Sequence, residues 1–462
     1  MGLRKVSVVI LSWNGRRHLE ACLPALREQR DPGVPWEVLV LDNGSTDGTA
    51  EWVRAEHPEV RLVVSHRNLG FCSGNNRLVR EADGDAVVLL NNDTRPRPDW
   101  LATLVDALAS APEDVAAVSG AIVDWGGECL DFARGLLTFD GHAFQLGYGR
   151  PLGEVDLPAA GSELLFACGG NMIVRRDAYL AAGGFDDAYF AYLEDVDLGW
   201  RLWAMGHRIL LAPEAVVHHR SMATSQLLGN DNRGFLFERN AFWTAYKNLD
   251  AELWPRLMPA IELALLHRTQ TLLVQNNPGT ETFTLDPYAG AIANTGVAGP
   301  GSTGNGTGGA VGDGTAFAPS AALAPAAAVP RTSLREKWRG YGPSGFVRRG
   351  LRKAARLALP SWVFDDLTPA APRVVDPRTV SQLRALTYLL GHLDAAADRR
   401  RTVQGLRRRP DREIFERFPL AVVPTYPGDE QLFDSAAFEA WLPDDLPFTR
   451  LRLDQVMDLD PG

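Results

Sequence analysis

The sequence is poor in cysteine, in long apolar runs and in positive charge, and each shortage excludes a class of protein. Its four cysteines, Cys22, Cys72, Cys129 and Cys168, have no paired spacing, so we expect neither a disulfide framework nor a zinc site, and a reducing cytoplasm fits. No apolar run approaches the roughly 20 residues that a membrane-spanning helix needs. The net charge of −10 argues against nucleic acid as a partner.

Two common nucleotide-binding motifs are also missing. No G-x-G-x-x-G follows the first predicted strand, and the chain contains no G-x-x-x-x-G-K-S/T. Both motifs hold phosphates with backbone amides at the start of a helix. A nucleotide bound to this chain would therefore be held by carboxylates, side-chain amides and a metal ion.

What the sequence does contain is an α/β pattern. With 45% hydrophobic and 23% charged residues, its 462 residues suggest a globular protein of two or three domains. Apolar strands at Val6–Leu11, Trp36–Leu41 and Ala86–Leu90 alternate with helical segments such as His18–Gln29 and Thr49–Glu56. This alternation predicts a parallel sheet covered by helices on both faces.

Polar residues follow these strands where each strand ends. They are Trp13-Asn14, Asp42-Asn43 and Asn91-Asn92-Asp93. In open α/β sheets, ligands bind at the carboxyl ends of the strands. The sequence therefore predicts a binding site along this edge.

A cluster of acids lies farther along the chain, at Glu194, Asp195 and Asp197, beside the aromatic residues Tyr192 and Trp200. Helical spacing begins within the cluster, and acids in a first helical turn suit the helix dipole. A capped surface helix would explain the acids alone. The neighbouring aromatic residues favour a shielded site for a general base.

Several motifs occur in an order that resembles the family 2 glycosyltransferases with the GT-A fold, especially their rhamnosyltransferase-like branch. The resemblance covers roughly residues 5–250 and rests on Val8–Gly15, Asp42–Gly48, Asn68–Phe71, Leu90–Thr94, Gly183–Asp186 and Glu194-Asp195. It implies a Rossmann-like mixed sheet with helices on both faces. It also implies an inverting transferase that uses a nucleotide-sugar donor and Mg²⁺ or Mn²⁺.

The resemblance also implies roles for single residues. Asp195 matches the catalytic base, and Asp93 and His219 match the metal site. The positions that match the donor-nucleotide site are Ser12, Trp13, Asn14, Asp42, Asn68, Asn75, Asn91 and Asn92. The positions expected near the donor sugar or the acceptor are Gly170, Asn171, Asp186, Glu194, Trp200 and Arg201.

Three of these assignments leave alternatives open. Asn91 replaces the first acid of the family's D-x-D motif, so the charge that attracts a metal rests on Asp93. His218 could be the metal ligand, although spacing favours His219. Arg201 could pair with Asp197, because the two are four residues apart on a helix.

The C-terminal part is expected to be mainly helical. We divide the chain into a GT-A domain (1–250), a helical extension (251–288), a flexible linker rich in Gly, Ala and Pro (289–330), and a helical region (331–462). Phe346–Ala358 is a basic amphipathic helix that suits either an anionic membrane surface or docking on its own domain.

Two further expectations concern the end of this region. A helix over Val380–Arg400 should turn Leu383, Leu386, Leu390 and Leu393 inward. The arginines of Arg399–Arg401 and Arg407–Arg409 should form a solvated basic face.

These observations predict an inverting, metal-dependent glycosyltransferase. Its donor would be dTDP-L-rhamnose, or alternatively a UDP-sugar such as UDP-galactofuranose, and its acceptor a cell-surface or secreted glycan or a lipid-linked precursor. It would work in the cytoplasm or on the inner face of the cell membrane. A sugar nucleotidyltransferase would need a Gly-rich loop where Ser12-Trp13-Asn14-Gly15 stands. A non-catalytic sugar-binding scaffold would not need Asp93, Asp195 and His219.

Overall fold

A mixed sheet forms the centre of the computed structural model, which describes residues 2–220, 230–276 and 377–457. The strands lie in the order β3-β2-β1-β4-β10-β6-β11-β5, and β7 pairs with β6. Their bounds are β1 Val6–Ser12, β2 Trp36–Asn43, β3 Arg61–Ser65, β4 Ala86–Asn91, β5 Thr94–Pro96, β6 Val115–Asp124, β7 Leu130–Phe132, β10 Asn171–Arg175 and β11 Arg208–His219. The predicted linker and the basic amphipathic helix lie outside the described residues.

The sheet is parallel from β3 to β4 and then becomes mixed. β10 runs antiparallel to both β4 and β6, and β5 runs antiparallel to β11. In the order β3-β2-β1-β4, strand β1 has β2 on one side and β4 on the other. The strand order therefore reverses direction at β1. Such a switch point opens a crevice at the carboxyl ends of the strands. The predicted polar strand ends meet there.

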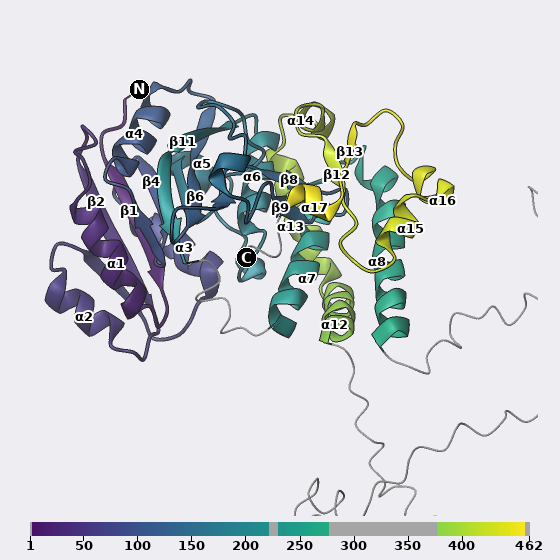
Figure 1. Ribbon diagram of the computed structural model, residues 1–462, viewed down its shortest axis with the longest axis horizontal. Coiled ribbons are helices and arrows are strands. Elements are labelled where there is room, and N and C mark those ends of the chain that lie inside the picture. Colours follow the sequence, from purple (N-terminus) through teal and green to yellow (C-terminus); the bar gives the residue numbers. More distant parts are fainter. Residues whose placement is uncertain (1, 221–229, 277–376, 458–462) are drawn as a thin grey trace, which may run out of the picture. The chain divides into compact units, whose positions relative to one another are not determined.

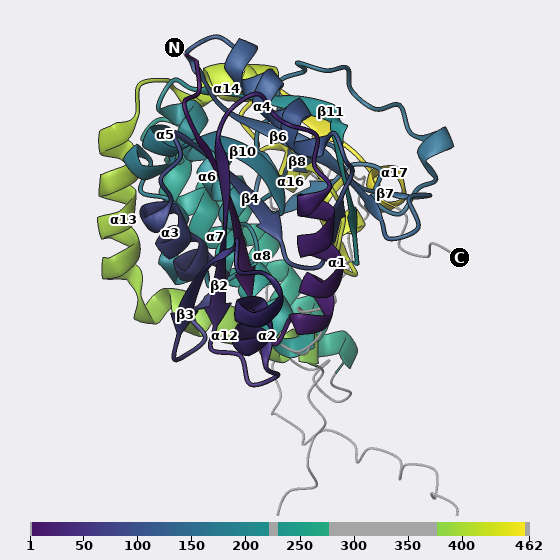
Figure 2. The same cartoon turned by 90° about the vertical axis from the view of Figure 1, so that its left-hand side faces the viewer.

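Helices cover both faces of this sheet, as predicted. Figure 2 shows α1 and α3 on opposite sides of β4. The helices of this part are α1 Arg16–Arg27, α2 Thr49–Glu56, α3 Gly70–Glu81, α4 Trp100–Ser110, α5 Arg176–Ala181 and α6 Glu194–Ala204. Because both faces are covered, the strands β1 and β4 are buried almost without interruption, which accounts for their continuous apolar sequences.

The C-terminal part is mainly helical, as predicted, and its elements pack on one another and on the sheet domain. Figure 1 shows α7, α12 and α8 side by side, and α12 is in contact with both α7 and α8. The elements are α7 Asn230–Asn248, α8 Trp254–Asn276, α12 Pro377–Gly391, α13 Leu393–Leu406, α14 Asp411–Arg417, α15 Asp429–Phe433, α16 Ala436–Glu439 and α17 Leu453–Val456, with short strands β12 Leu420–Val422 and β13 Phe448–Arg450. Earlier in the chain, β8 Gly135–Leu137 pairs with β9 Ala143–Gln145, and β8 contacts β12. None of the described helices is long and apolar enough to cross a bilayer.

The prediction of one helix over Val380–Arg400 with its leucines inward is wrong. The helix stops at Gly391 and a second one starts at Leu393, so the leucines do not share one continuous face. Leu390 is 71% exposed, and Leu383 and Leu393 are also exposed. Ala385 and Leu389 are buried in place of the predicted leucines.

The arginines predicted to form a solvated face instead bind the sheet domain, with Arg401 and Arg408 as exposed exceptions. Arg400 donates to the carbonyl oxygen of Leu249 at 2.6 Å, and Arg409 to that of Trp203 at 3.1 Å. Arg407 pairs with Asp411 at 2.7 Å. The C-terminal helices are therefore joined to the end of α6 and the end of α7 by charged hydrogen bonds.

A buried group of charges connects α6 with α7. Lys247, on α7, lies 2.8 Å from a carboxylate oxygen of Asp186 and 2.8 Å from one of Asp197. Asp197 also pairs with Arg201 at 2.8 Å, and Arg399 reaches Asp186 from α13. All but Arg399 are almost fully buried. Removing one partner of such a group leaves an uncompensated buried charge.

We predict a pH-dependent loss of stability for Asp186→Asn. Burial favours the neutral acid, but Lys247 and Arg399 outweigh burial and lower the pKa of Asp186 to about 2. Because that pKa is below the ordinary 3.8, the carboxylate stabilises the fold at neutral pH by about 2 kcal/mol, and this contribution fades as the pH falls from about 4 toward 2.

Urea unfolding, monitored by tryptophan fluorescence, measures the difference in the free energy of unfolding between the variant and wild type. It should be largest at pH 7 and should shrink by about half at pH 3. Asp187→Asn, at the exposed neighbouring position, is the matched control and should change stability by less than about 0.5 kcal/mol. A difference independent of pH would show that the charge of Asp186 contributes nothing.

Candidate active site

A cavity of about 670 Å³ opens at the carboxyl ends of β1, β2 and β4. Its polar part includes Trp13, Asn43, Asn68, Asn91, Asn92, Asp93, Asp131, Gln145, Glu194, Asp195 and His219. Its apolar part includes Phe132, Phe144, Tyr148, Phe166, Phe190, Phe237 and Met457. One cavity thus joins strand ends from the N-terminal half with α7 and the segment after α17.

The side chain of Asn68 is held at the polar end by its neighbour Asn43. The Asn43 amide donates to Oδ1 of Asn68 at 2.9 Å, and the same Oδ1 accepts the N–H of Gly70 at 2.8 Å. Asn43 in turn accepts the N–H of Leu69. These bonds fix the loop between β3 and α3 against the end of β2, beside Trp13.

Asp93 and His219 face each other at the ends of neighbouring segments. Nε2 of His219 lies 3.3 Å from Asp93 Oδ1, and Nδ1 of His219 lies 2.8 Å from Asp131 Oδ2. Burial lowers the pKa of His219, but the two carboxylates outweigh burial and raise it to about 10. His218 does not line the cavity and lies against Gly127 instead. The structure thus brings His219, and not His218, to Asp93.

The residues present fit a divalent cation that is shared with a diphosphate. Within the described ranges, no three His, Cys, Asp or Glu side chains gather as a complete metal site. Mg²⁺, however, commonly uses one or two protein ligands and takes its others from phosphate and water. Asp93 and His219 would supply two ligands, and Asp131 would orient the imidazole from behind, as outer carboxylates do at metal sites.

Glu194 and Asp195 lie on the wall of the same cavity, at the first turn of α6. Burial is the main cause that raises the pKa of both carboxyl groups, and the nearby charge of Asp195 raises that of Glu194 further. Asp195 accepts the N–H of Gly169 at 3.0 Å and that of Val196 at 2.8 Å. Glu194 Oε2 has no hydrogen-bond partner among the described residues. This pair suits proton transfer with a bound hydroxyl.

Asp197, the third acid of this cluster, points away from the cavity into the buried charged group with Lys247 and Arg201. The alternative that Arg201 pairs with Asp197 is thereby confirmed. Arg201 also donates to the carbonyl oxygen of Gly184 at 2.7 Å. Its guanidinium holds the turn before α6 and does not reach the cavity.

Other residues predicted near the sugar or acceptor also have partners elsewhere. Asp186 binds Lys247, and the indole N–H of Trp200 donates to Asp411 at 2.8 Å. The Asn171 amide donates to the Ala121 carbonyl within the sheet. Among the residues of that prediction, Gly170 and Glu194 line the cavity.

Half of the residues predicted at the donor nucleotide lie just behind the cavity wall. Ser12 accepts a hydrogen bond from Asn92, and Asn14 accepts the N–H of Thr46. Asp42 accepts the N–H of Ser45 at 3.3 Å, and Asn75 donates within its own helix. Trp13, Asn68, Asn91 and Asn92 line the cavity itself.

Sequence reasoning missed Asp131 and the apolar wall. Asp131 is 5% exposed on β7, between the buried residues Leu130 and Phe132. A single acid flanked by apolar residues in a short strand is a signal that it has a buried partner. No such signal existed for Met457, because its place depends on how the end of the chain folds back.

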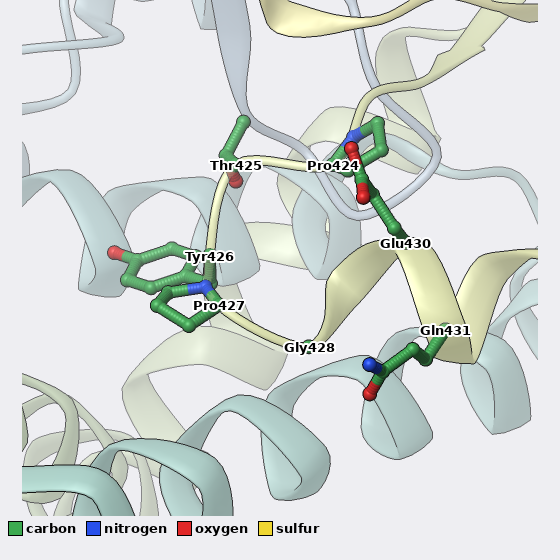
Figure 3. Close-up of a pocket in the computed structure, with 7 residues that line it drawn as sticks. All are labelled: Pro424, Thr425, Tyr426, Pro427, Gly428, Glu430 and Gln431. Atoms are coloured by element: carbon green, nitrogen blue, oxygen red, sulfur yellow. The ribbon is translucent and has the colours of Figure 1, made fainter.

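A second hollow, of about 220 Å³, lies in the C-terminal part (Figure 3). The chain from Pro424 to Gly428 leads into α15 along its wall, and Glu430 is its only charged lining residue. None of the residues predicted for catalysis lines it. It offers no convergent set of polar groups for chemistry.

Comparison with known proteins agrees with the geometry of the larger cavity. Residues 7–181 match the model of Glycosyl transferase family 2. An N-acetylglucosaminyl-diphospho-decaprenol L-rhamnosyltransferase from Mycobacterium tuberculosis is 31% identical over 264 residues, 51% of this chain and 85% of the relative. The chain belongs to glycosyl transferase family 2. It is a glycosyltransferase, and its relatives favour the rhamnosyltransferase-like branch of the family.

The chain is also similar to a further curated protein and to a solved structure. The O-antigen biosynthesis protein RfbC of Myxococcus xanthus is 30% identical over 234 residues, 48% of this chain and 18% of that protein. The solved mannosyltransferase PcManGT of Pyrobaculum calidifontis, in complex with GDP-Man and Mn²⁺, has a TM-score of 0.39 and 20% identity, covering 64% of this chain and 80% of its own.

Proposed function

We propose that this glycosyltransferase is an inverting, metal-dependent enzyme that transfers rhamnose from dTDP-L-rhamnose to a hydroxyl of a lipid-linked glycan acceptor. The observation that carries the proposal is that one cavity holds both the Asp93–His219 pair and the buried Glu194–Asp195 pair. The name of the mycobacterial relative supports the sugar and the acceptor class. Because such an acceptor is anchored in lipid, we place the reaction at the inner face of the cell membrane.

Asp195 acts as the general base. Its carboxylate takes the proton of the acceptor hydroxyl as the hydroxyl oxygen attacks the anomeric carbon of the donor. Burial strengthens Asp195 as a base, while the N–H groups of Gly169 and Val196 hold its orientation. Inversion needs one displacement, so no second nucleophile is required.

Asp93 and His219 would hold the divalent cation, and Asp131, 2.8 Å from Nδ1 of His219, would orient the imidazole. When bound, the cation neutralises the charge that develops on the leaving diphosphate. Trp13, Asn68, Asn91 and Asn92 line the donor end of the cavity. The aromatic residues of the apolar part exclude water, which would otherwise compete with the acceptor.

A UDP-sugar donor is the second candidate, because no side chain lining the cavity distinguishes thymine from uracil on chemical grounds alone. A panel of nucleotide sugars, with and without Mn²⁺, decides between them. Release of dTDP in the presence of a polyprenyl-diphosphate sugar acceptor supports the proposal. If only a UDP-sugar is turned over, the proposed donor dTDP-L-rhamnose is wrong and the UDP-sugar takes its place. If no donor supports transfer, the proposed function is rejected.

We predict that His219→Ala and His218→Ala differ sharply. Loss of His219 should weaken the Mn²⁺-dependent binding of dTDP by more than the roughly 10- to 100-fold that loss of an outer partner costs. Asp131→Asn should weaken this binding by about 10- to 100-fold. Asp93→Ala should abolish the dependence of dTDP binding on Mn²⁺. Calorimetry of dTDP binding with and without Mn²⁺ measures all four variants.

His218→Ala is the matched control, since its ring faces Gly127 and not the cavity. It should bind as wild type does. Equal losses for the two histidine variants, or unchanged affinity in Asp93→Ala, would remove this pair from the metal site.

We predict that Asp195→Asn abolishes transfer and leaves donor binding intact. The amide keeps the shape of the carboxyl group but cannot accept a proton, so single-turnover transfer should fall by about 10²- to 10⁴-fold. Glu194→Gln should lose less, because Glu194 is a neighbour of the base. Near-normal transfer by Asp195→Asn together with an inactive Glu194→Gln would exchange the two roles.

A further inference from the structure

The backbone that leads into the catalytic carboxylates is strained. In the part of the chain that the structure describes, four non-glycine residues have positive φ, and three of them are Phe190 (64°), Tyr192 (71°) and Leu193 (63°). Positive φ is unfavourable for a residue with a side chain, because Cβ then crowds the backbone. Three such residues directly before Glu194 and Asp195 require strong external contacts to hold them.

The contacts come from Asn240 on α7, which is 1% exposed. Its side-chain amide donates to the carbonyl oxygens of Tyr192 at 2.7 Å and Ala191 at 2.8 Å. These are the carbonyls that the left-handed backbone turns toward α7. The amide therefore stabilises the strained conformation directly.

Arg239 fixes which way the Asn240 amide points. Its guanidinium donates to Asn240 Oδ1 at 2.7 Å and 2.9 Å, so the NH₂ group must face the carbonyl oxygens of the loop. The same guanidinium donates to the carbonyl oxygens of Ala188 at 2.8 Å and Tyr189 at 2.7 Å. Two adjacent side chains thus bind four carbonyls of this segment, those of residues 188, 189, 191 and 192.

Arg239 is supported in turn by the C-terminal part of the chain. Its guanidinium carbon lies 4.8 Å from the ring centre of Tyr388, on α12, and 5.3 Å from that of Phe235. Such stacking holds a guanidinium without using its donors. A chain of contacts therefore runs from α12 through Arg239 and Asn240 to the catalytic loop.

We propose that Asn240 and Arg239 are positioning residues for the transfer reaction. They hold the segment in which Phe190, Tyr192 and Leu193 have positive φ, and this segment leads to Asp195 on the cavity wall. The proposal rests on the proposed function of Asp195 as the base. It assigns a role in the reaction to α7, which follows the part of the chain that matches the family model.

Asn240→Asp tests the proposal, because a carboxylate still accepts from Arg239 but cannot donate to Ala191 and Tyr192. We expect kcat to fall by about 10- to 100-fold, as small misplacements of catalytic groups do. The Mn²⁺-dependent affinity for dTDP should stay within twofold of wild type, because Asp93 and His219 do not contact this loop. The pH profile of kcat should shift, since Asp195 would leave its buried setting.

Trp243→Phe is the matched control. Trp243 is buried on the same helix and packs on Tyr388, but no hydrogen bond joins it to the catalytic loop among the described residues. It should keep the wild-type kcat and pH profile. Hydrogen exchange of the peptide that covers residues 186–197 should rise in Asn240→Asp and stay unchanged in Trp243→Phe.

Arg239→Lys serves if Asn240→Asp does not fold. Lysine keeps the positive charge but lacks the forked N–H donors of the guanidinium. This variant should therefore show a smaller loss of kcat and the same rise in hydrogen exchange of residues 186–197. Wild-type kcat, pH profile and exchange in Asn240→Asp would overturn the proposal, and so would equal losses in Trp243→Phe. If Asp195→Asn itself transfers normally, the proposed function fails first; if only the Asn240 and Arg239 variants transfer normally, this inference alone fails.

Discussion

The ammonium group of Lys247 is the constraint on which the catalytic half of the structure depends. It lies between Asp186 and Asp197, two buried carboxylates that precede and begin α6. Each of these charges would be costly to bury alone, so the three are stable only together. Since Lys247 is on α7, the charges of α6 are compensated only where α7 packs against it. The position of the acids in the first turn of α6 thereby depends on Lys247, some fifty residues later in the sequence.

The same logic explains why several C-terminal arginines are half-buried. Arg400 and Arg409 bind the carbonyl oxygens of Leu249 and Trp203. Arg407 pairs with Asp411 on α14, which accepts the Trp200 indole N–H at 2.8 Å. A guanidinium has five donors, so it can satisfy several carbonyl oxygens at the ends of helices at once. From sequence, a run of arginines indicates a solvated surface. Whether such a run meets carbonyls or water depends on docking, which no local pattern encodes.

The parts of the fold that local patterns specify were predictable. The strands β1, β2 and β4 and the helix Thr49–Glu56 follow from apolar periodicity, and the sheet edge that carries the site follows from where the polar residues stand. Asp93, His219, Glu194 and Asp195 were all found in this way or through family resemblance, and the cavity brings them together.

The rest required distant contacts. Trp200 and Arg201 share a helix with Asp195, and proximity in sequence suggested a shared site, but helical rotation turns their side chains away from the cavity. Asp131 and Asn240 act through partners 88 and 48 or more residues away, so their own neighbours in sequence give little indication of their roles. Leu383 and Leu390 are exposed because α12 buries the face that carries Ser381, Ala385 and Leu389, and Leu393 belongs to a separate helix after the break at Gly391.

The environments of the acids on α6 separate their roles. Asp197 faces Arg201 and Lys247, which together outweigh burial and lower its pKa, so it stays ionised and structural. Asp195, two residues earlier, has only backbone N–H donors, and burial raises its pKa. One turn of helix thus carries an acid that must keep its charge for the fold and another that can exchange a proton with a substrate. Such divergence between neighbouring carboxyl groups is what distinguishes a base from its supports. Here the divergence arises from α7, because Lys247 neutralises Asp197 while Asn240 turns the loop that carries Asp195 toward the cavity.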